Sequence, residues 1–297
     1  MKKVFSFACF VLLAASLAGA QGVEKSYIMK EGASLWTLKG KTMTWAASLN
    51  LGQELLSASK ETTKGAYKEV EYDLVKVKTD ANEEGYVIAS LVARDARGLA
   101  VVTGTLATLY SQARDTAVLS TVIPRMNLVA VWEVPGKGDF LKVAGFASDT
   151  GSSFADKYLL VSDLSVIEKD VNAAMLLQAI KEQKKKEQKL KTLQIINQKY
   201  PGSVFGPTVS EIRAALDVEN VATEPYAASL TATDTVNIRD IPSTFGSVVV
   251  AIKKGETATA IARTTAQYEI NDQKGKWIKV STPKEGWLFD AYVTAQQ

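Results

Sequence analysis

Few side chains in this sequence could carry out acid–base or nucleophilic chemistry. The 297 residues include no histidine and one cysteine, Cys9. These counts exclude a Ser-His or Cys-His nucleophile pair, an imidazole proton shuttle and a zinc site of the usual kind. Two carboxylates, Asp156 and Asp290, lie near the ends of strand-rich segments. Nothing in the sequence pairs them across a cleft, as glycoside hydrolysis requires, so we expect no catalytic residue and rank a carboxylate-based hydrolase last.

Aromatic side chains are stronger candidates for ligand binding, because small β-barrels bind sugars and peptides in shallow aromatic grooves. The best candidate groove contains four residues of the last segment: Tyr268, Trp287, Asp290 and Tyr292. Trp287 follows a glycine at a predicted strand start, which makes it the first residue to mutate. The alternative is that these rings fill the core of a small barrel, and for any single aromatic residue we favour that packing role.

The distribution of charge and the short motifs limit the classes of ligand that the protein could bind. Residues 181–189 form a basic run, KEQKKKEQK, that could attract an anionic wall polymer or lipid headgroups, but its charge is spread around the helix axis, which favours a solvated surface. Over the whole chain 35 basic residues face 32 acidic ones, too even a balance for a nucleic-acid binder that works through bulk charge. The sequence has no glycine-rich phosphate loop, EF-hand or nucleotide signature, so we expect no cofactor and no metal site.

The amino terminus is typical of an export signal over residues 1–20. Lys2-Lys3 gives a basic start, residues 4–15 are almost entirely apolar, and small residues lead to a predicted cleavage site after Ala20. Cys9 lies inside the apolar run, which argues against lipidation. An uncleaved anchor helix is the alternative, but the run is short for a membrane span. We therefore expect an exported protein of the periplasm or cell envelope, with no span after cleavage.

Three similar segments indicate an internal repeat. Each contains a large apolar residue, an aliphatic residue, lysine and valine, at residues 74–77, 140–143 and 277–280. The alternation predicts strands whose lysine faces away from the core. A block with an aromatic residue follows each, at Gly85-Tyr86-Val87, Ser153-Phe154-Ala155 and Gly286-Trp287-Leu288. The closing blocks correspond as residues 89–92, 156–159 and 290–293. Several brief strands with polar turns predict a small antiparallel barrel or sandwich in each unit.

The third unit carries a more specific pattern. Its blocks are VNIRDIPS at 236–243, VVVAIKKGE at 248–256, KWIKV at 276–280 and GWL at 286–288. Together they resemble bacterial SH3-like domains over residues 236–293. The first two units depart from the family, with Trp36 and Tyr110 where the family has arginine. The resemblance implies accessory modules that bind cell-wall peptides or glycans, or other proteins.

A segment of strong helix formers separates the second and third units. Residues 165–200 contain no glycine or proline and predict one helix about 50 Å long. Ser165 and Glu168 have the spacing of a capping box, and apolar residues gather at the two ends of the segment while residues 181–189 have none. This distribution predicts a helix that docks both ends and crosses solvent in the middle. A second helix is expected around Thr208 and Glu211.

These observations predict a mainly β protein of three small SH3-like barrels with a long helical spacer. The expected divisions are a signal peptide at 1–20, barrels at 25–95, 99–164 and 228–297, and the spacer at 165–222. We expect an exported, non-catalytic binding protein, not an enzyme, whose partner is a cell-wall peptide or glycan or an envelope protein, and not a nucleic acid. The alternative is a scaffolding protein that assembles, or associates with itself, through the helical segment.

Overall fold

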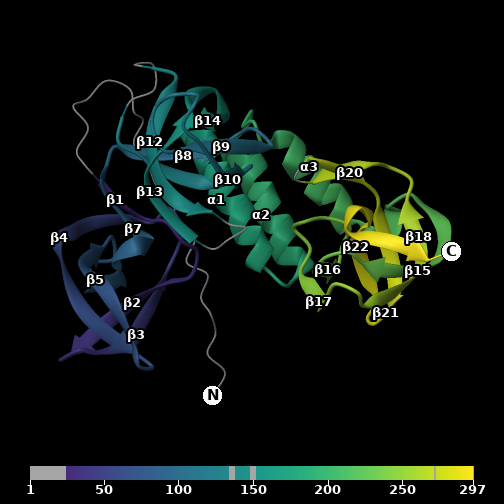
Figure 1. Cartoon of the computed structure of the whole chain (residues 1–297), viewed down its shortest axis with the longest axis horizontal. Helices are drawn as coiled ribbons and strands as arrows, with labels where there is room; N and C mark the ends of the chain where they lie inside the picture. Colours follow the sequence, from purple (N-terminus) through teal and green to yellow (C-terminus); the bar gives the residue numbers. More distant parts are fainter. Residues whose placement is uncertain (1–24, 134–137, 148–151, 271, 297) are drawn as a thin grey trace.

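The chain folds into three large β-sheets and one helical segment. The computed structural model describes residues 25–133, 138–147, 152–270 and 272–296, so the predicted export signal lies outside the described residues. In Figure 1 the first sheet lies at lower left, the second above it, and the helices stand between the second sheet and the third. The prediction of a mainly β protein is confirmed. Within the described ranges, no helix has the length and apolar character needed to cross a membrane.

The strands are short and follow one another closely along the chain. The first sheet contains β1 (Lys25–Ile28), β2 (Ala33–Lys39), β3 (Thr42–Leu49), β4 (Glu54–Tyr67), β5 (Val70–Thr79), β6 (Glu84–Ile88) and β7 (Val92–Ala96). The second contains β8 (Gly98–Val102), β9 (Leu106–Tyr110), β10 (Val118–Pro124), β11 (Leu128–Val131), β12 (Phe140–Ala147), β13 (Ser152–Leu160) and β14 (Leu164–Ser165). The third contains β15 (Thr223–Ala232), β16 (Val236–Arg239), β17 (Val248–Ile252), β18 (Thr257–Thr264), β21 (Trp277–Thr282), β22 (Gly286–Phe289) and β23 (Val293–Gln296). A separate hairpin, β19 (Tyr268–Ile270) and β20 (Gln273–Gly275), is inserted in the third.

The three large sheets share one topology. Their strand orders are β3-β2-β6-β5-β4-β1-β7, β10-β9-β13-β12-β11-β8-β14 and β17-β16-β22-β21-β18-β15-β23. Once the inserted β19–β20 hairpin is set aside, the three orders are the same. A 3-10 helix also precedes the last strand of each, at Ala89–Leu91, Val161–Asp163 and Asp290–Tyr292. The sheets are therefore repeats of one unit, whereas the domain boundaries and the description as SH3-like barrels stay predictions.

The register corrects how the second unit matches the others. Lys76 pairs with Tyr86 and Lys279 with Trp287, but Lys142 pairs with Tyr158 and not with Phe154. The closing 3-10 helix is likewise at residues 161–163, not within 156–159. The reason is that β12 and β13 stay paired as far as Ala147 and Ser152, so their hairpin places the matching residues later in the chain.

The helical segment differs from the predicted single helix. It contains α1 (Glu168–Glu182), α2 (Lys186–Lys199) and α3 (Gly206–Leu216), followed by a 3-10 helix η3 (Val218–Asn220). Gln183 is extended, and its Nε2 donates to Thr192 Oγ1 at 2.9 Å, whereas residues nine apart in a continuous helix lie about 13 Å apart along the axis. The chain therefore reverses at residues 183–185, and the prediction of one 50 Å helix was wrong.

The reversal brings the two apolar ends of the segment together. Leu177 and Ile180 of α1 share a buried cluster with Leu193 and Ile196 of α2. These side chains are thus covered by their own chain, which removes the sequence argument for self-association through the helix ends. The predicted solvent-crossing middle was also wrong at Lys189, which is 1% exposed.

Shared cores join the sheets to one another. The helical cluster extends to Val101 and Leu128 of the second sheet and to Ile241 and Phe245 beside the third. A second cluster joins the first two sheets through these residues: Tyr27, Met29, Ala93, Ala96 and Ala130, with Leu99, Trp132 and Phe146 packed against it. Trp132 Nε1 adds a hydrogen bond to the carbonyl oxygen of Arg94 at 3.1 Å. Burial of apolar surface therefore holds the repeats together as well as each repeat within itself.

Asp170 begins the helical segment in place of the predicted capping box. Its carboxylate accepts hydrogen bonds from Ser165 Oγ at 2.7 Å and from the backbone N–H of Val204 at 3.0 Å, and the residue is fully buried. Ser165 therefore donates its hydroxyl hydrogen bond to Asp170, and it does not form the predicted capping box with Glu168. The first bond ties the first turn of α1 to β14, and the second ties it to the segment that leads into α3.

We expect Asp170→Asn to lower the free energy of unfolding by about 2 kcal/mol, because hydrogen bonds to a charged group contribute about 1.5–3 kcal/mol and the amide keeps only one acceptor oxygen. Urea denaturation followed by circular dichroism measures this change. Glu168→Gln, in the same first turn, is the control, for which we expect a loss below about 1 kcal/mol from the helix dipole alone. Equal losses in the two variants would contradict the role given to Asp170.

Candidate functional site

The four residues predicted to bind a ligand gather at one end of the third sheet, around a closed aromatic cluster. Trp287 is 3% exposed and packs with Trp277 and Phe289. Tyr268 and Tyr292 are half-buried at the edge of this cluster. Val218 and Val221, from the link between α3 and β15, pack against the same cluster. The ring of Trp287 is therefore a core side chain, as the packing alternative held, and offers no open face for stacking.

Asp290 closes one end of the β21–β22 strand pair. Its Oδ1 accepts a hydrogen bond from the backbone N–H of Lys276 at 2.9 Å, while its own N–H donates to the carbonyl oxygen of Lys276 at 3.0 Å. Gly275 is required beside it, because a Cβ at this position would lie in direct collision with the Asp290 carboxylate. The carboxylate thus serves local structure.

Asp156 lies in a different sheet and is paired with a lysine. Its carboxylate contacts Lys142 Nζ at 2.6 Å, and this hydrogen bond, together with the charge of Lys142, lowers the pKa of Asp156. Asp156 is therefore held in its ionised form. The structure does not bring Asp156 and Asp290 together, and within the described ranges no group of three or more Cys, Asp or Glu side chains could hold a metal ion.

A row of side chains that sequence reasoning missed recurs on each sheet. Directly opposed residues on neighbouring strands place their side chains on the same face of a sheet. In the first sheet the row is Trp45, Trp36, Tyr86 and Lys76. In the second it is Val118, Tyr110, Tyr158 and Lys142. In the third it is Val248, Arg239, Trp287 and Lys279. We call this set the outer row, because the aliphatic residues on either side of each lysine point into the core.

Each outer row ends in the same ion pair. Lys76 contacts Glu84 at 3.2 Å, Lys142 contacts Asp156 at 2.6 Å, and Lys279 contacts Glu285 at 2.9 Å. In all three sheets the acidic residue lies two positions before the aromatic residue of the row. This spacing is visible in the sequence and could have identified the row. These ion pairs are at the surface, so each contributes about 1 kcal/mol or less to folding stability. Their common feature is that they occupy the same position in each sheet.

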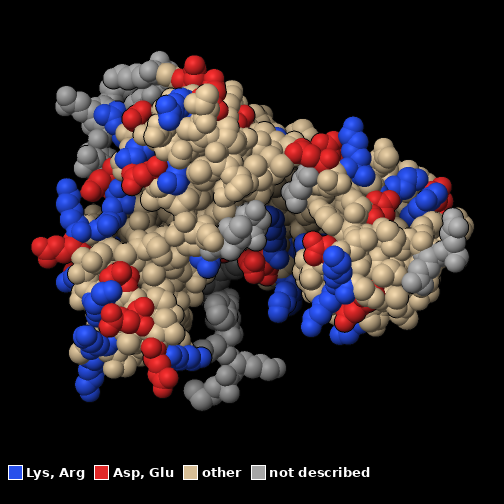
Figure 2. Space-filling model, in the orientation of Figure 1, with Lys and Arg blue, Asp and Glu red and all other residues tan. Residues whose placement is uncertain are grey.

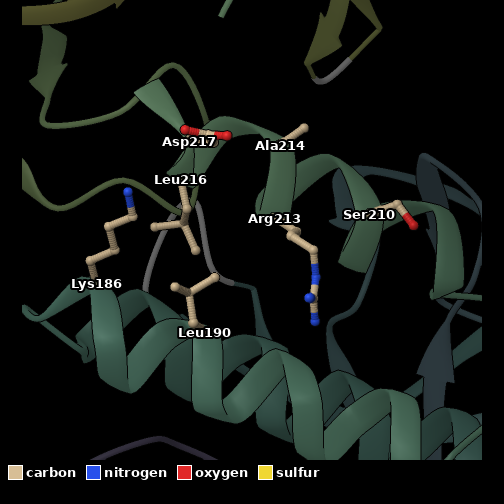
Figure 3. Close-up of a pocket in the computed structure, with 7 residues that line it drawn as sticks. All are labelled: Lys186, Leu190, Ser210, Arg213, Ala214, Leu216 and Asp217. Carbon is tan, nitrogen blue, oxygen red and sulfur yellow. The ribbon is translucent and has the colours of Figure 1, made fainter. Parts of the chain in front are cut away.

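A hollow of about 490 Å³ lies between α2 and α3 (Figure 3). Leu190 and Leu216 face one another in it, between the side chains of Lys186 and Arg213. The hydroxyl of Ser210, which also lines the hollow, donates to the carbonyl oxygen of Gly206 at 3.2 Å. No general base lies among the lining residues beside that hydroxyl, so the hollow has no activated nucleophile.

Comparison with known proteins gives only distant structural similarity. No family model and no curated protein matches the chain. A structure titled "The crystal structure of Ly7917 with the hydrolyzing product of MDP" is 14% identical, with a TM-score of 0.23 over 67% of each chain. A structure described as a novel NlpC/P60 endopeptidase from Photobacterium damselae subsp. piscicida is 11% identical, with a TM-score of 0.24 over 92% of this chain and 66% of that one. The structure of NlpC2 from Trichomonas vaginalis is 8% identical, with a TM-score of 0.18 over 93% of this chain and 97% of that one.

These similarities run against two expectations from the sequence, that the protein is a non-catalytic binding protein and that it is not an enzyme. Two of the three titles name an endopeptidase or a hydrolysis product, so both expectations are corrected and neither is kept. The expectations rested on the lack of histidine and of a second cysteine, on the absence of a sequence pattern that pairs Asp156 with Asp290, and on the resemblance to accessory SH3-like modules. At TM-scores of 0.24 and below, no reaction, substrate or catalytic residue is transferred to this chain.

Proposed function

We propose that this protein takes part in peptidoglycan processing in the bacterial cell envelope, and that its three sheets are SH3-like barrels that recognise wall peptide or glycan. The observation that carries the proposal is the repetition of one seven-stranded order with one outer row in all three sheets. Repeated recognition units suit a ligand that is itself a repeating polymer, because linked sites raise the effective concentration of the second contact.

Two further features support the proposal. The blocks in residues 236–293 that resemble bacterial SH3-like domains coincide with β16, β17, β21 and β22. The export signal expected at residues 1–20 would deliver the protein to the compartment where peptidoglycan lies. The distant structural neighbours add no weight, because their TM-scores are too low.

The test uses the full chain and purified peptidoglycan sacculi, and it measures both retention and turnover. We expect the protein to sediment with sacculi and to increase the soluble fragments detected by liquid chromatography and mass spectrometry. An unrelated protein of similar size and charge is the control. Failure to sediment contradicts the recognition part of the proposal, and retention without released fragments contradicts the processing part.

A further inference from the structure

The outer row of the first sheet differs from its counterparts because its exposed end is an aromatic side chain. Trp45 is 57% exposed, and at the same position the second and third sheets have Val118, at 58%, and Val248, at 50%. Within the described ranges, two of the large hydrophobic side chains that are more than a third exposed are aromatic, and both, Trp45 and Tyr67, belong to the first sheet. Exposed aromatic surface of this kind marks an interaction site more often than does a single exposed aliphatic residue.

The neighbours of Trp45 form an aromatic cluster in which the rings of Trp36 and Tyr67 are tilted by 47°. Trp36 lies opposite Trp45 on β2, Tyr86 lies opposite Trp36 on β6, and the Tyr67 ring lies 4.9 Å from the Trp36 ring. Trp36 and Tyr86 also belong to a buried cluster with Met43 and Leu74, which fixes their rings. A ligand that stacks here therefore meets a pre-formed surface and orders few side chains on binding.

A polar group without a partner lies directly under this surface. Trp36 Nε1 is buried and has no hydrogen-bond partner among the described residues. A buried donor that makes no hydrogen bond destabilises the folded state by about 1–3 kcal/mol, so such groups are rare. This unpaired donor belongs to the ring against which Tyr67 packs and which lies opposite Trp45.

Most charges around the platform are paired, although Lys68 Nζ lies 5.3 Å from the centre of the Tyr67 ring. Lys76 is paired with Glu84, and Lys64 contacts Asp73 at 2.9 Å and Glu71 at 3.6 Å. Figure 2 shows basic and acidic side chains intermingled over the first sheet, at lower left. A surface with matched charges does not concentrate an anionic polymer. It suits a neutral ligand that has one apolar face and several hydroxyl groups.

We propose that Trp45, with Tyr67 and Tyr86 beside it, is a stacking platform for a neutral pyranose ring of a glycan. The ring's C–H face would lie on the exposed indole of Trp45, at the end of the outer row opposite the Lys76–Glu84 pair. This inference rests on the proposed function and names the substrate class and the repeat that binds it. It also moves the binding site from the third sheet, where Trp287 is buried, to the first.

The test titrates the full chain with a neutral tetramer of β-1,4-linked N-acetylglucosamine and follows binding by isothermal titration calorimetry. We expect wild type to bind, Trp45→Ala to lose about tenfold or more in affinity, and Trp45→Phe to keep most of it, because an aromatic ring is retained. Leu56→Ala is the matched control. Leu56 is 58% exposed on β4 of the same sheet, and its truncation should leave affinity within about twofold.

Several outcomes would overturn the platform. Wild-type affinity in Trp45→Ala, an equal loss in Leu56→Ala, or no binding of the tetramer by wild type each contradicts it. Circular dichroism melting of each variant separates loss of binding from loss of folding, and Trp45 is exposed enough that its truncation should leave the melt unchanged. Retention on sacculi without tetramer binding would remove the platform while leaving the proposed recognition of the wall intact.

Discussion

Phe205→Ala should lower the free energy of unfolding by about 3–5 kcal/mol, the usual range when a buried phenylalanine is truncated. Phe205 is 0% exposed, immediately before α3, in the cluster that joins the three helices to the second and third sheets. The guanidinium group of Arg125, from the second repeat, lies 5.1 Å from the centre of its ring. The substitution therefore removes packing at the place where three parts of the chain meet.

Urea denaturation followed by circular dichroism measures this change, and Val204→Ala is a matched control. Val204 is the preceding residue and is 45% exposed, so its truncation should change stability by less than about 0.5 kcal/mol. Its backbone groups, which bond to Asp170 and Arg125, are the same in the variant. Similar losses of stability in the two variants would show that the packing between the helices and the second and third sheets does not depend on the Phe205 ring.

The repeated units were predictable because their strands are short and alternate regularly. The lysine at the third position of each block, as in Leu74-Val75-Lys76-Val77, faces outward, and the residues beside it are buried, as the period of two requires. Registers between strands were less predictable. Residues 153–159 contain two aromatic side chains, Phe154 and Tyr158, and only the pairing of Lys142 with Tyr158 decides between them.

The helical segment shows where propensity alone misleads. Every residue from 165 to 200 is compatible with a helix, yet the chain turns back at Gln183. In a straight helix the two apolar ends would each need a different surface to cover them. The reversal instead places Ile180 and Leu193 in one buried cluster. Tertiary burial outweighs the few intrahelical hydrogen bonds lost at the turn.

Trp287, the central residue of the predicted site, is buried for a related reason. The third unit has the clearest sequence pattern, but a large aromatic residue in a clear pattern is often there to fill the core, as Trp287 does. Exposure distinguishes the two roles, and exposure depends on what else covers the sheet. In the third sheet Val218 and Val221 close the aromatic cluster, and neither residue belongs to the repeat itself.

Lys189→Ala should lower the free energy of unfolding by about 3 kcal/mol, because Lys189 is a buried lysine that links α2 to the third repeat. Its Nζ donates to the carbonyl oxygen of Phe245 at 2.7 Å and lies 3.4 Å from Ser247 Oγ. Truncation leaves that carbonyl without its donor and removes buried methylene groups, and each effect is worth about 1–3 kcal/mol. Lys186→Ala, on the exposed side of the same helix, is the control and should change stability by less than about 0.5 kcal/mol.

Lys189→Met separates the packing of the side chain from its charge, and pH provides the readout. Burial lowers the pKa of Lys189 below its ordinary value of 10.5, with Arg239 acting in the same direction and Asp240 against it. Between the lowered pKa and 10.5 the unfolded chain binds more protons than the folded one, so the cost of burying the charged amine is relieved as pH rises through that window. The stability of wild type should therefore increase relative to Lys189→Met as pH rises in urea titrations. A difference that is constant with pH would contradict the lowered pKa of Lys189. A methionine variant as stable as wild type at every pH would show that the hydrogen bonds of the buried amine do not stabilise the contact between α2 and the third repeat.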